Sequence, residues 1–164
     1  MKHQPHLGLR TGIGFDFHAF SGSGTIVLGG HRIPGCPALS GHSDADVLIH
    51  AVMDAVLGAA GEVDIGTLYP DTDEAFRGAD STELARQVVR MVRERGFTII
   101  NIDAVLICDR PLISAARPGI RASLAGAFGI ETECVNVKGK TREGQQGRGE
   151  GVEAVAVVLL ASSP

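Results

Sequence analysis

Residues 41–58 read Gly-His-Ser-Asp-Ala-Asp-Val-Leu-Ile-His-Ala-Val-Met-Asp-Ala-Val-Leu-Gly, and this stretch decides how the chain folds. Its small and apolar residues predict a helix. Ser43 or Asp44 can cap the start of the helix, and Gly58 and Gly61 are expected to mark its end. We therefore expect one buried helix around which the other elements are arranged.

A polar row interrupts this apolar helix. Asp46, His50 and Asp54 recur at intervals of four, which places them on one helical face. Buried charges are costly unless they are paired or bound to a metal. The row has two interpretations: an Asp–His–Asp set that is solvated or satisfies itself, or a metal ligand at His50 whose ring a carboxylate orients. The helix alone favours the first.

Residues 9–20 precede the helix and alternate in the manner of a strand, with apolar residues on one side. Asp16 and His18 fall together on the other side. An Asp-x-His pair alone is most often a solvated strand face. With His50 added, however, the set becomes two imidazoles and one carboxylate with a fourth position open, which suits zinc.

Composition sets the broad class. The chain has 164 residues, a net charge of −4 and 44% hydrophobic residues, which predict one domain with a core that needs no disulfides. We expect a loose tail over residues 1–8 and a single domain over residues 9–164. Interspersed charges argue against binding nucleic acid, and no apolar run is long enough to span a membrane. Three cysteines without close pairing indicate reduced core residues of a cytoplasmic protein.

The rest of the chain alternates between strand and helix patterns. The fold class predicted is α+β: a largely antiparallel four-stranded sheet with helices on one face, plus a small hairpin. The other face of the sheet is then free to pack against sister subunits. The further elements expected are a strand or hairpin over 25–33, helices over 80–95 and about 118–128, and strands over 97–109, 135–140 and 152–161.

Three loops carry candidate site residues, each with a plainer alternative. His42 and Ser43 stand at the mouth of the central helix, where they can face a phosphate or only cap the helix. In the loop over 63–73, Asp64 and Asp71 can hold a polyol or form Asx-turns. The glycine-rich loop over 141–151 offers a phosphate and cation site or a surface turn, with Lys138, Lys140, Thr141, Glu143 and Arg148 at hand.

A set of motifs spread from Leu9 to the C-terminus resembles one family. The motifs are GxGFDxHAF, LGG, GHSDADVLxHAxxDAxLGAA, DIGxLYPDTD, GADS, NIDAVL, VNVK and GRGEG. They are similar to those of the 2-C-methyl-D-erythritol 2,4-cyclodiphosphate synthases of the non-mevalonate isoprenoid pathway. The resemblance implies a homotrimer with active sites between subunits. It also implies cyclisation of a small-molecule diphosphocytidyl substrate, 4-diphosphocytidyl-2-C-methyl-D-erythritol 2-phosphate, with release of CMP.

The resemblance also implies residue roles. Asp16, His18 and His50 would bind zinc or another divalent transition metal, and Glu143 would bind a second ion, Mg²⁺ or Mn²⁺. His42 and Thr141 would stabilise the transition state. Further substrate contacts would come from Ser43, Asp64, Ile65, Gly66, Tyr69, Asp71, Asp73, Lys140 and Arg148, and the CMP part would lie between residues 108–114 and 140–143.

The chain departs from the family pattern mainly in the part expected to bind the nucleotide. Leu112 replaces a usual lysine, Lys140 replaces a usual threonine, Val63 replaces a usual glycine, and the loop over 143–147 is about two residues short. We hypothesise that Lys140 supplies the charge lost at Leu112. Two other functions are compatible with parts of this pattern: a metal-dependent phosphohydrolase, and a non-catalytic trimeric protein that binds a nucleotide or a metal.

Overall fold

The computed structural model describes residues 8–41, 43–70, 72–73, 78–143 and 150–162. Within these residues, no helix combines the length and apolar character needed to cross a bilayer. Of the expected tail, only residue 8 falls in the described part of the chain.

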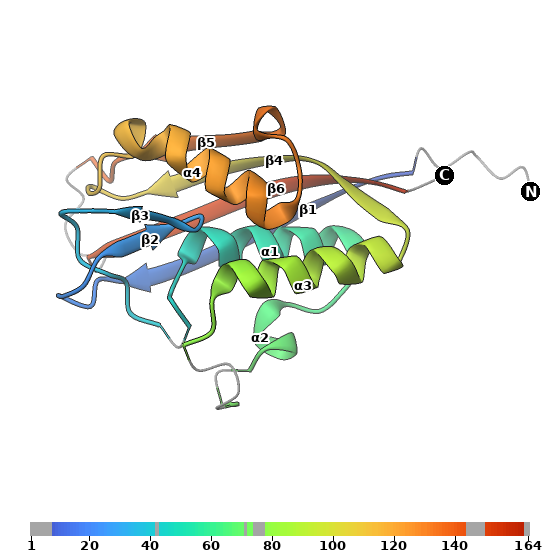
Figure 1. Cartoon of the computed structure of the whole chain (residues 1–164), viewed down its shortest axis with the longest axis horizontal. Helices are drawn as coiled ribbons and strands as arrows, with labels where there is room; N and C mark the ends of the chain where they lie inside the picture. Colours follow the sequence, from blue (N-terminus) through green and yellow to red (C-terminus); the bar gives the residue numbers. More distant parts are fainter. Residues whose placement is uncertain (1–7, 42, 71, 74–77, 144–149, 163–164) are drawn as a thin grey trace, which may run out of the picture.

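The fold is built on a mixed four-stranded sheet with the order β1-β6-β4-β5 (Figure 1). Strand β6 (Gly151–Ser162) is antiparallel to β1 (Leu9–Ala19) and to β4 (Phe97–Ile107). Strand β5 (Val135–Lys140) is parallel to β4, because helix α4 (Ile113–Phe128) returns the chain to the same end of the sheet. The largely antiparallel sheet is therefore confirmed, with a parallel pair at one edge.

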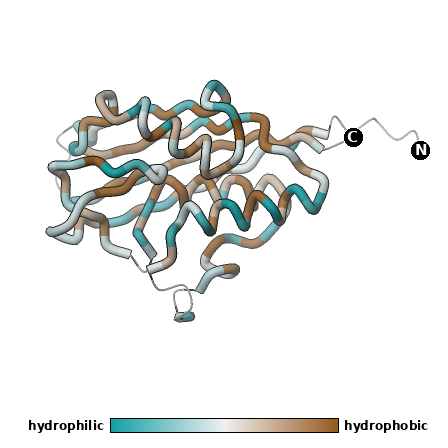
Figure 2. The backbone as a smooth tube through the Cα atoms, in the orientation of Figure 1, coloured by the Kyte–Doolittle hydropathy of each residue, from teal (hydrophilic) through white to brown (hydrophobic). Residues whose placement is uncertain are grey.

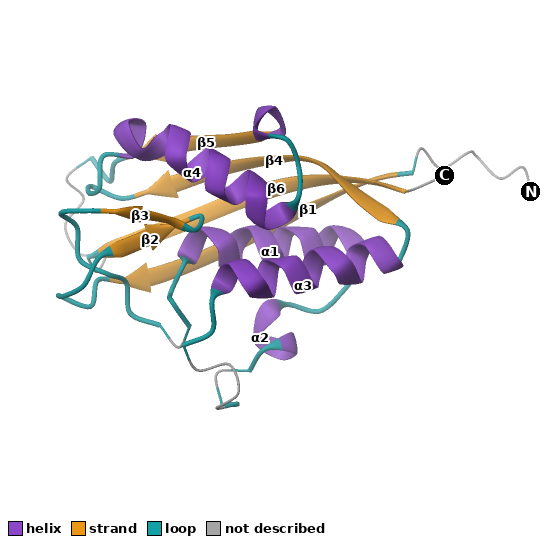
Figure 3. Ribbon diagram, viewed as in Figure 1, coloured by secondary structure: helices purple, strands orange, loops and turns teal. Residues whose placement is uncertain are grey.

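The three long helices lie on one face of this sheet (Figure 3). Helix α1 (Val47–Ala60) packs directly on β1 and β6, and α3 (Ser81–Glu94) packs against α1. The expected hairpin is present as a separate two-stranded sheet. The smaller elements are β2 (Ile26–Leu28), β3 (His31–Ile33), the one-turn helix α2 (Ile65–Leu68) and a 3₁₀ turn, η2 (Thr132–Cys134).

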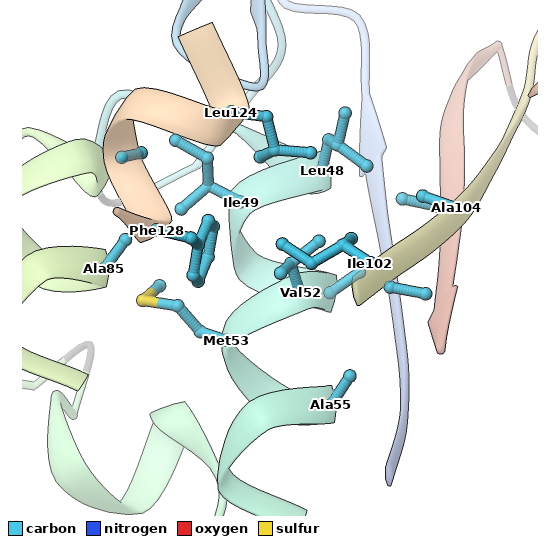
Figure 4. Close-up of a cluster of buried hydrophobic side chains, with 14 of the residues drawn as sticks. Leu48, Ile49, Val52, Met53, Ala55, Ala85, Ile102, Ala104, Leu124 and Phe128 are labelled. Atoms are coloured by element: carbon cyan, nitrogen blue, oxygen red, sulfur yellow. The ribbon is translucent and has the colours of Figure 1, made fainter. Parts of the chain in front are cut away.

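Helix α1 is the centre of the core, which is why its sequence is apolar nearly all round (Figure 2). Its backbone lies very close to β1. A Cβ added at Gly14 would stand 1.9 Å from the Ala51 carbonyl oxygen, so only glycine fits at this crossing. Side chains of α1 also pack against side chains of β4 and α4. This buried cluster includes Leu48, Val52, Ile102, Leu124 and Phe128 (Figure 4).

The start of helix α1 differs from expectation, whereas its end does not. Helix α1 begins at Val47 with Asp46 as its N-cap, rather than at Ser43 or Asp44, because the chain is still in a left-handed conformation at Ala45 (φ 56°). The predicted stop at Gly61 is confirmed by its left-handed cap geometry.

Helix α4 begins at Ile113, five residues before the expected start at Pro118. A proline that lacks a backbone N–H is normally read as a helix start. Ile113 and Ile120 are both buried, which explains why the helix continues on the N-terminal side of Pro118 as far as Ile113. The proline then costs one backbone hydrogen bond inside the helix.

The sheet face away from the helices is unusually apolar. Ile13, Phe15 and Phe17 alternate along β1 and are 71%, 59% and 41% exposed, and Val157 of the paired strand β6 is 44% exposed. The alternation places these side chains of β1 on the face of the strand that does not carry Asp16 and His18, as the sequence predicts.

Candidate metal centre and substrate pocket

Asp16, His18 and His50 come together in the folded chain. Oδ2 of Asp16 lies 2.9 Å from Nε2 of His18 and 3.1 Å from Nδ1 of His50. The two ring nitrogens are 3.3 Å apart. The side chains are 25%, 18% and 12% exposed, so the cluster is partly shielded yet open on one side.

The sequence places these residues through two different periodicities. Asp16 and His18 share one face of β1 because strand side chains repeat every two residues. His50 projects from the first turn of α1. The close packing of α1 on β1 brings the imidazole of His50 over this face. No single stretch of sequence contains the cluster.

The three donor atoms have a spacing suited to one tetrahedral ion. At metal–ligand distances of about 2.0–2.1 Å, ligand atoms of a zinc tetrahedron stand about 3.3 Å apart. The observed separations of 2.9–3.3 Å lie close to this value. Two imidazole nitrogens and one carboxylate oxygen also form a usual donor set for zinc, with the fourth position left for substrate.

The ring of His18 is held in one orientation. Its Nδ1 lies 2.7 Å from the carbonyl oxygen of Ser40, which can only accept a hydrogen bond. In the neutral ring Nδ1 therefore carries the proton, and Nε2 has the lone pair that a metal in the cluster would need. An outer partner of this kind is typical of metal-binding histidines.

The electrostatics of the cluster favour an ionised carboxylate. Burial by itself raises the pKa of Asp16, but hydrogen bonds and charge interactions with the rings of His18 and His50, which act when those rings are protonated, outweigh it and hold that pKa well below its usual range. Burial lowers the pKa of His18, and the bond and charge of Asp16 reverse this effect to a net rise. Asp16 is therefore ready to act as an anionic ligand.

The polar row of α1 does not act as one unit. Asp46 is fully buried and accepts N–H groups from Gly29 and Gly30 besides capping α1. Burial raises the pKa of Asp46, and these N–H bonds oppose the rise. Asp54 accepts the Ile65 N–H at 2.9 Å. Neither carboxylate hydrogen-bonds the His50 ring in the described part of the chain, so the expected orienting carboxylate is not found there.

A cavity of about 240 Å³ opens beside the cluster and gathers residues from four separate segments. Its lining residues are Asp16, His18, Gly41, Ser43, His50, Met53, Asp54, Ile65, Gly66, Tyr69 and Leu84. Four of the residues predicted to contact substrate therefore line this cavity: Ser43, Ile65, Gly66 and Tyr69. Asp54 binds the backbone of α2 and so fixes one wall of this cavity.

The other residues predicted to bind the polyol do not line this cavity in the described part of the chain. Asp64 caps α2 through the Thr67 N–H and lines a neighbouring hollow rather than the cavity itself. The Thr67 hydroxyl and N–H lower the pKa of Asp64. Asp73 follows Pro70 in a turn and is exposed. His42, Asp71 and Arg148 lie outside the described residues.

The residues predicted to bind the nucleotide form a second, separate hollow. It has about 120 Å³, lies between the end of β4 and the end of β5, and contains Leu112, Lys140 and Thr141. The Thr141 hydroxyl donates to Glu143 at 2.8 Å, so these two predicted residues are side by side. The two hollows share no lining residue, so within one chain the zinc-type cluster and this loop do not form a common pocket.

Three residues near these pockets are not among the predicted metal ligands or substrate contacts. Ser81 contacts His50, Asp54 supports the cavity wall, and Arg117 lines the second hollow. Ser81 belongs to the GADS motif and Asp54 to the polar row, so both carried a signal in the sequence. Arg117 had none, because it lies inside a helix whose start was expected one residue later.

Comparison with known proteins gives a consistent picture. Residues 9–161 match the YgbB family. A 2-C-methyl-D-erythritol 2,4-cyclodiphosphate synthase of Rubrobacter xylanophilus is 53% identical over 158 residues, which cover 93% of this chain and 95% of that protein. The synthase of Thioalkalivibrio sulfidiphilus is 49% identical over 94% of this chain and 98% of its own length.

Solved structures that are similar to this chain include synthases of the same kind. A 2C-methyl-D-erythritol-2,4-cyclodiphosphate synthase in a CDP-bound form has a TM-score of 0.85 and 36% identity, covering 92% of this chain and 99% of that one. The IspF–CDP complex of Plasmodium falciparum has a TM-score of 0.83 and 30% identity, with 97% and 99% covered. The bifunctional IspDF of Campylobacter jejuni has a TM-score of 0.89 and 40% identity, and this chain spans 42% of it.

Proposed function

Because the chain belongs to the YgbB family, we propose that the cluster of Asp16, His18 and His50 is the metal centre of its reaction. The chain is an enzyme, and its activity is that of its relatives, the synthesis of 2-C-methyl-D-erythritol 2,4-cyclodiphosphate. The observation that carries the proposal is the 2.9–3.3 Å convergence of one carboxylate and two imidazoles beside a cavity.

The reaction is a cyclisation within one substrate molecule, 4-diphosphocytidyl-2-C-methyl-D-erythritol 2-phosphate. An oxygen of the 2-phosphate forms a bond to the diphosphate phosphorus that is attached to methylerythritol. The bond from that phosphorus to the bridging oxygen breaks, and this oxygen leaves as part of CMP. The electron pair leaves with CMP. Since no water or second substrate is consumed, we class the enzyme as a phosphorus–oxygen lyase.

The nucleophile needs no general base, because the 2-phosphate is already anionic at neutral pH. The task of the protein is to fold a flexible polyanion so that its phosphates meet, and positioning of this kind is worth about 7–11 kcal/mol in well-oriented intramolecular reactions. A zinc ion held by Asp16, His18 and His50 would supply positive charge for the diphosphate oxygens. Ser43 lies beside His50 in the cavity wall, and its hydroxyl can donate a hydrogen bond to the diphosphate oxygens.

The methylerythritol part is assigned to the far wall of the cavity. Ile65, Gly66 and Tyr69 present the backbone and ring of the α2 segment there, and Asp54 holds that segment through the Ile65 N–H. We assign Asp64, Asp71 and Asp73 to the same substrate part as acceptors for its hydroxyl groups. His42 is assigned to transition-state stabilisation.

The nucleotide part is assigned to the second hollow, contributed by a neighbouring subunit of a homotrimer. Two observations support this arrangement. The two hollows are separate within one chain, and the outer face of the sheet exposes Ile13, Phe15, Phe17 and Val157, which a subunit interface would bury. Exposed apolar faces often mark interfaces between proteins, and symmetric assemblies of identical chains are the commonest kind.

In that second half, Thr141 is assigned to the transition state and Glu143 to a second ion, Mg²⁺ or Mn²⁺. Mg²⁺ is commonly bound by one or two carboxylates together with substrate phosphates, so a single exposed Glu143 fits this role. Lys140 lines the hollow where Leu112 lacks a charge, and Lys140 and Arg148 are assigned to the phosphates. We place the enzyme in the cytoplasm, on the basis of its cysteine usage.

The decisive experiment incubates purified, metal-loaded protein with the diphosphocytidyl substrate and follows both CMP and the phosphorus-containing product. We expect CMP and the cyclic diphosphate in equal amounts, with loss of turnover after metal stripping and recovery on adding zinc. His50→Ala should behave as the stripped enzyme does, while Glu83→Gln, on the surface of α3, serves as the matched control. Ring-free products would indicate a phosphohydrolase, and CMP binding without turnover would indicate a binding protein.

A further inference from the structure

The second ring nitrogen of His50 points away from Asp16 and His18, toward the start of α3. It lies 3.0 Å from Oγ of Ser81 and 3.2 Å from Oγ of Ser43. Ser81 is the first residue of α3 and is fully buried. The outer partners of the His50 ring are therefore hydroxyl groups.

A carboxylate stands behind the Ser81 hydroxyl. Oγ of Ser81 donates to Oδ1 of Asp44 at 2.5 Å, and the backbone N–H of Ser81 donates to Oδ2 of Asp44 at 3.2 Å. An ionised carboxylate only accepts hydrogen bonds, and a serine hydroxyl has a single proton. Because that proton is used on Asp44, the Ser81 oxygen faces His50 as an acceptor.

The segment that carries Asp44 is fixed by several contacts. The Asp44 N–H donates to the Ala79 carbonyl at 3.2 Å, and Oδ1 of Asp44 also accepts the Asp46 N–H at 3.3 Å. Between them Ala45 has φ 56°, a left-handed conformation that alanine adopts only where its surroundings impose it. Asp44 is therefore aimed at Ser81 by a rigid turn.

We propose that Asp44 and Ser81 are positioning residues that hold His50 as its Nε2–H tautomer and so reserve the Nδ1 lone pair for the metal. This inference rests on the proposed function of the cluster. In the other tautomer, Nδ1–H would donate to Asp16, 3.1 Å away, and could not bind an ion. Asp16 pulls the proton of the neutral ring toward Nδ1, and the Ser81 oxygen, already committed as an acceptor, opposes this pull and favours the form that can bind the metal.

Ser43 cannot substitute fully for Ser81 in this role. Its hydroxyl oxygen is farther from Nε2, at 3.2 Å, and also accepts the Ala45 N–H at 3.2 Å. It has no carboxylate partner among the described residues that would fix the direction of its proton. The carboxylate expected to orient His50 is thus Asp44, acting through Ser81, rather than Asp46 or Asp54.

The test measures zinc affinity by competition with a chelator, using metal-stripped full-length protein and no substrate. Ser81→Ala should weaken zinc binding by about 10–100-fold, the usual effect of removing an outer partner of a metal ligand. Ser81→Thr, which keeps the hydroxyl, should stay near wild type. Asp44→Asn preserves volume but offers an N–H₂ group, and it should weaken binding by a smaller factor.

A matched control separates positioning from general loosening of α3. Asp80 is the N-cap of α3 and accepts the Thr82 N–H, yet it has no hydrogen bond to His50. Asp80→Ala should lower the thermal stability without changing zinc affinity. Nitrogen-15 NMR of the histidines in metal-stripped protein gives an independent readout: His50 should carry its proton on Nε2 in wild type and shift toward Nδ1–H in Asp44→Asn.

The outcomes are distinct. Unchanged zinc affinity in folded Ser81→Ala and Asp44→Asn, an equal loss in Asp80→Ala, or an Nδ1–H tautomer in wild type would each overturn the inference while leaving the metal centre intact. Wild-type protein that does not bind zinc at all would overturn the proposed metal centre instead. The NMR measurement on wild type needs no variant, so poor folding of a mutant does not prevent a decision.

Discussion

The carboxylate of Asp46 accepts the backbone N–H of Gly30 at a distance of 2.6 Å, although Asp46 begins a helix and Gly30 lies in a hairpin turn. The same carboxylate accepts N–H groups of Gly29, Leu48 and Ile49. One fully buried side chain thus joins the hairpin to the central helix.

Replacing Asp46 with alanine should therefore destabilise the protein strongly. Four N–H groups, three of them buried, would lose their acceptor, and we expect a loss of about 3–5 kcal/mol in the free energy of unfolding. Chemical denaturation of Asp46→Ala, with Asp80→Ala as a cap variant that should lose only about 1 kcal/mol, measures this. Equal losses in the two variants would show that the hairpin contacts add nothing.

The contact between β1 and α1 makes a second prediction. Gly14→Ala would place its Cβ 1.9 Å from the Ala51 carbonyl oxygen and should cost about 3 kcal/mol or more, because backbone must move on both sides. Gly126→Ala is the matched control, since nothing lies within 4 Å of its Cβ inside α4. It should stabilise the helix by about 0.5–1 kcal/mol. Thermal unfolding of the two variants compares these opposite signs.

A third prediction concerns alkaline pH. Burial, followed by the nearby Cys36 and Asp109, raises the pKa of Cys108 from 9.0 to about 11. Because the folded pKa lies above the unfolded one, the neutral thiol contributes stability that is complete below pH 9 and is lost as pH rises from 9 to about 11. Urea midpoints at about pH 8 and about pH 10.5 should fall more steeply for wild type than for Cys108→Ala. Cys134→Ala should keep the wild-type slope.

The separation of the two hollows predicts complementation between inactive subunits. His50→Ala damages the metal half, and Thr141→Ala damages the nucleotide half. If a site takes its halves from two subunits, co-expressed mixtures should recover about a quarter of the wild-type activity at random assembly. Activity and sedimentation of the mixture are measured together. Mixed trimers that stay inactive would place both halves in one chain.

Lys140 provides the last prediction. It lines the second hollow beside Leu112, so Lys140→Ala should raise the KM for the diphosphocytidyl substrate about tenfold through loss of a charge-assisted contact, with a smaller effect on kcat. Lys138→Ala is the control, because Lys138 is paired with Asp103 at 2.6 Å on the sheet. An unchanged KM would show that the charge missing at Leu112 is not replaced by Lys140.

The sequence by itself determined most of the elements and singled out Asp16, His18 and His50, which the fold brings together as a group that could bind a metal. Period two on β1 separates Asp16 from its apolar neighbours, and the apolar pattern identifies α1 as the central helix. Gly61 stops that helix where glycine is needed for a left-handed cap. These features depend on local geometry, which neighbouring residues in the chain specify.

Tertiary structure alone decided which carboxylate does what. Asp46, Asp44 and Asp54 are similar in sequence context, yet one ties the hairpin, one directs Ser81 toward His50, and one supports α2. The start of α1 at residue 47 depends on the left-handed turn at Ala45, beside which Asp44 contacts Ala79 and Ser81 at the start of α3. A hydrogen bond depends on distance and direction between groups that are far apart in the chain, and a spacing rule within one helix cannot supply either.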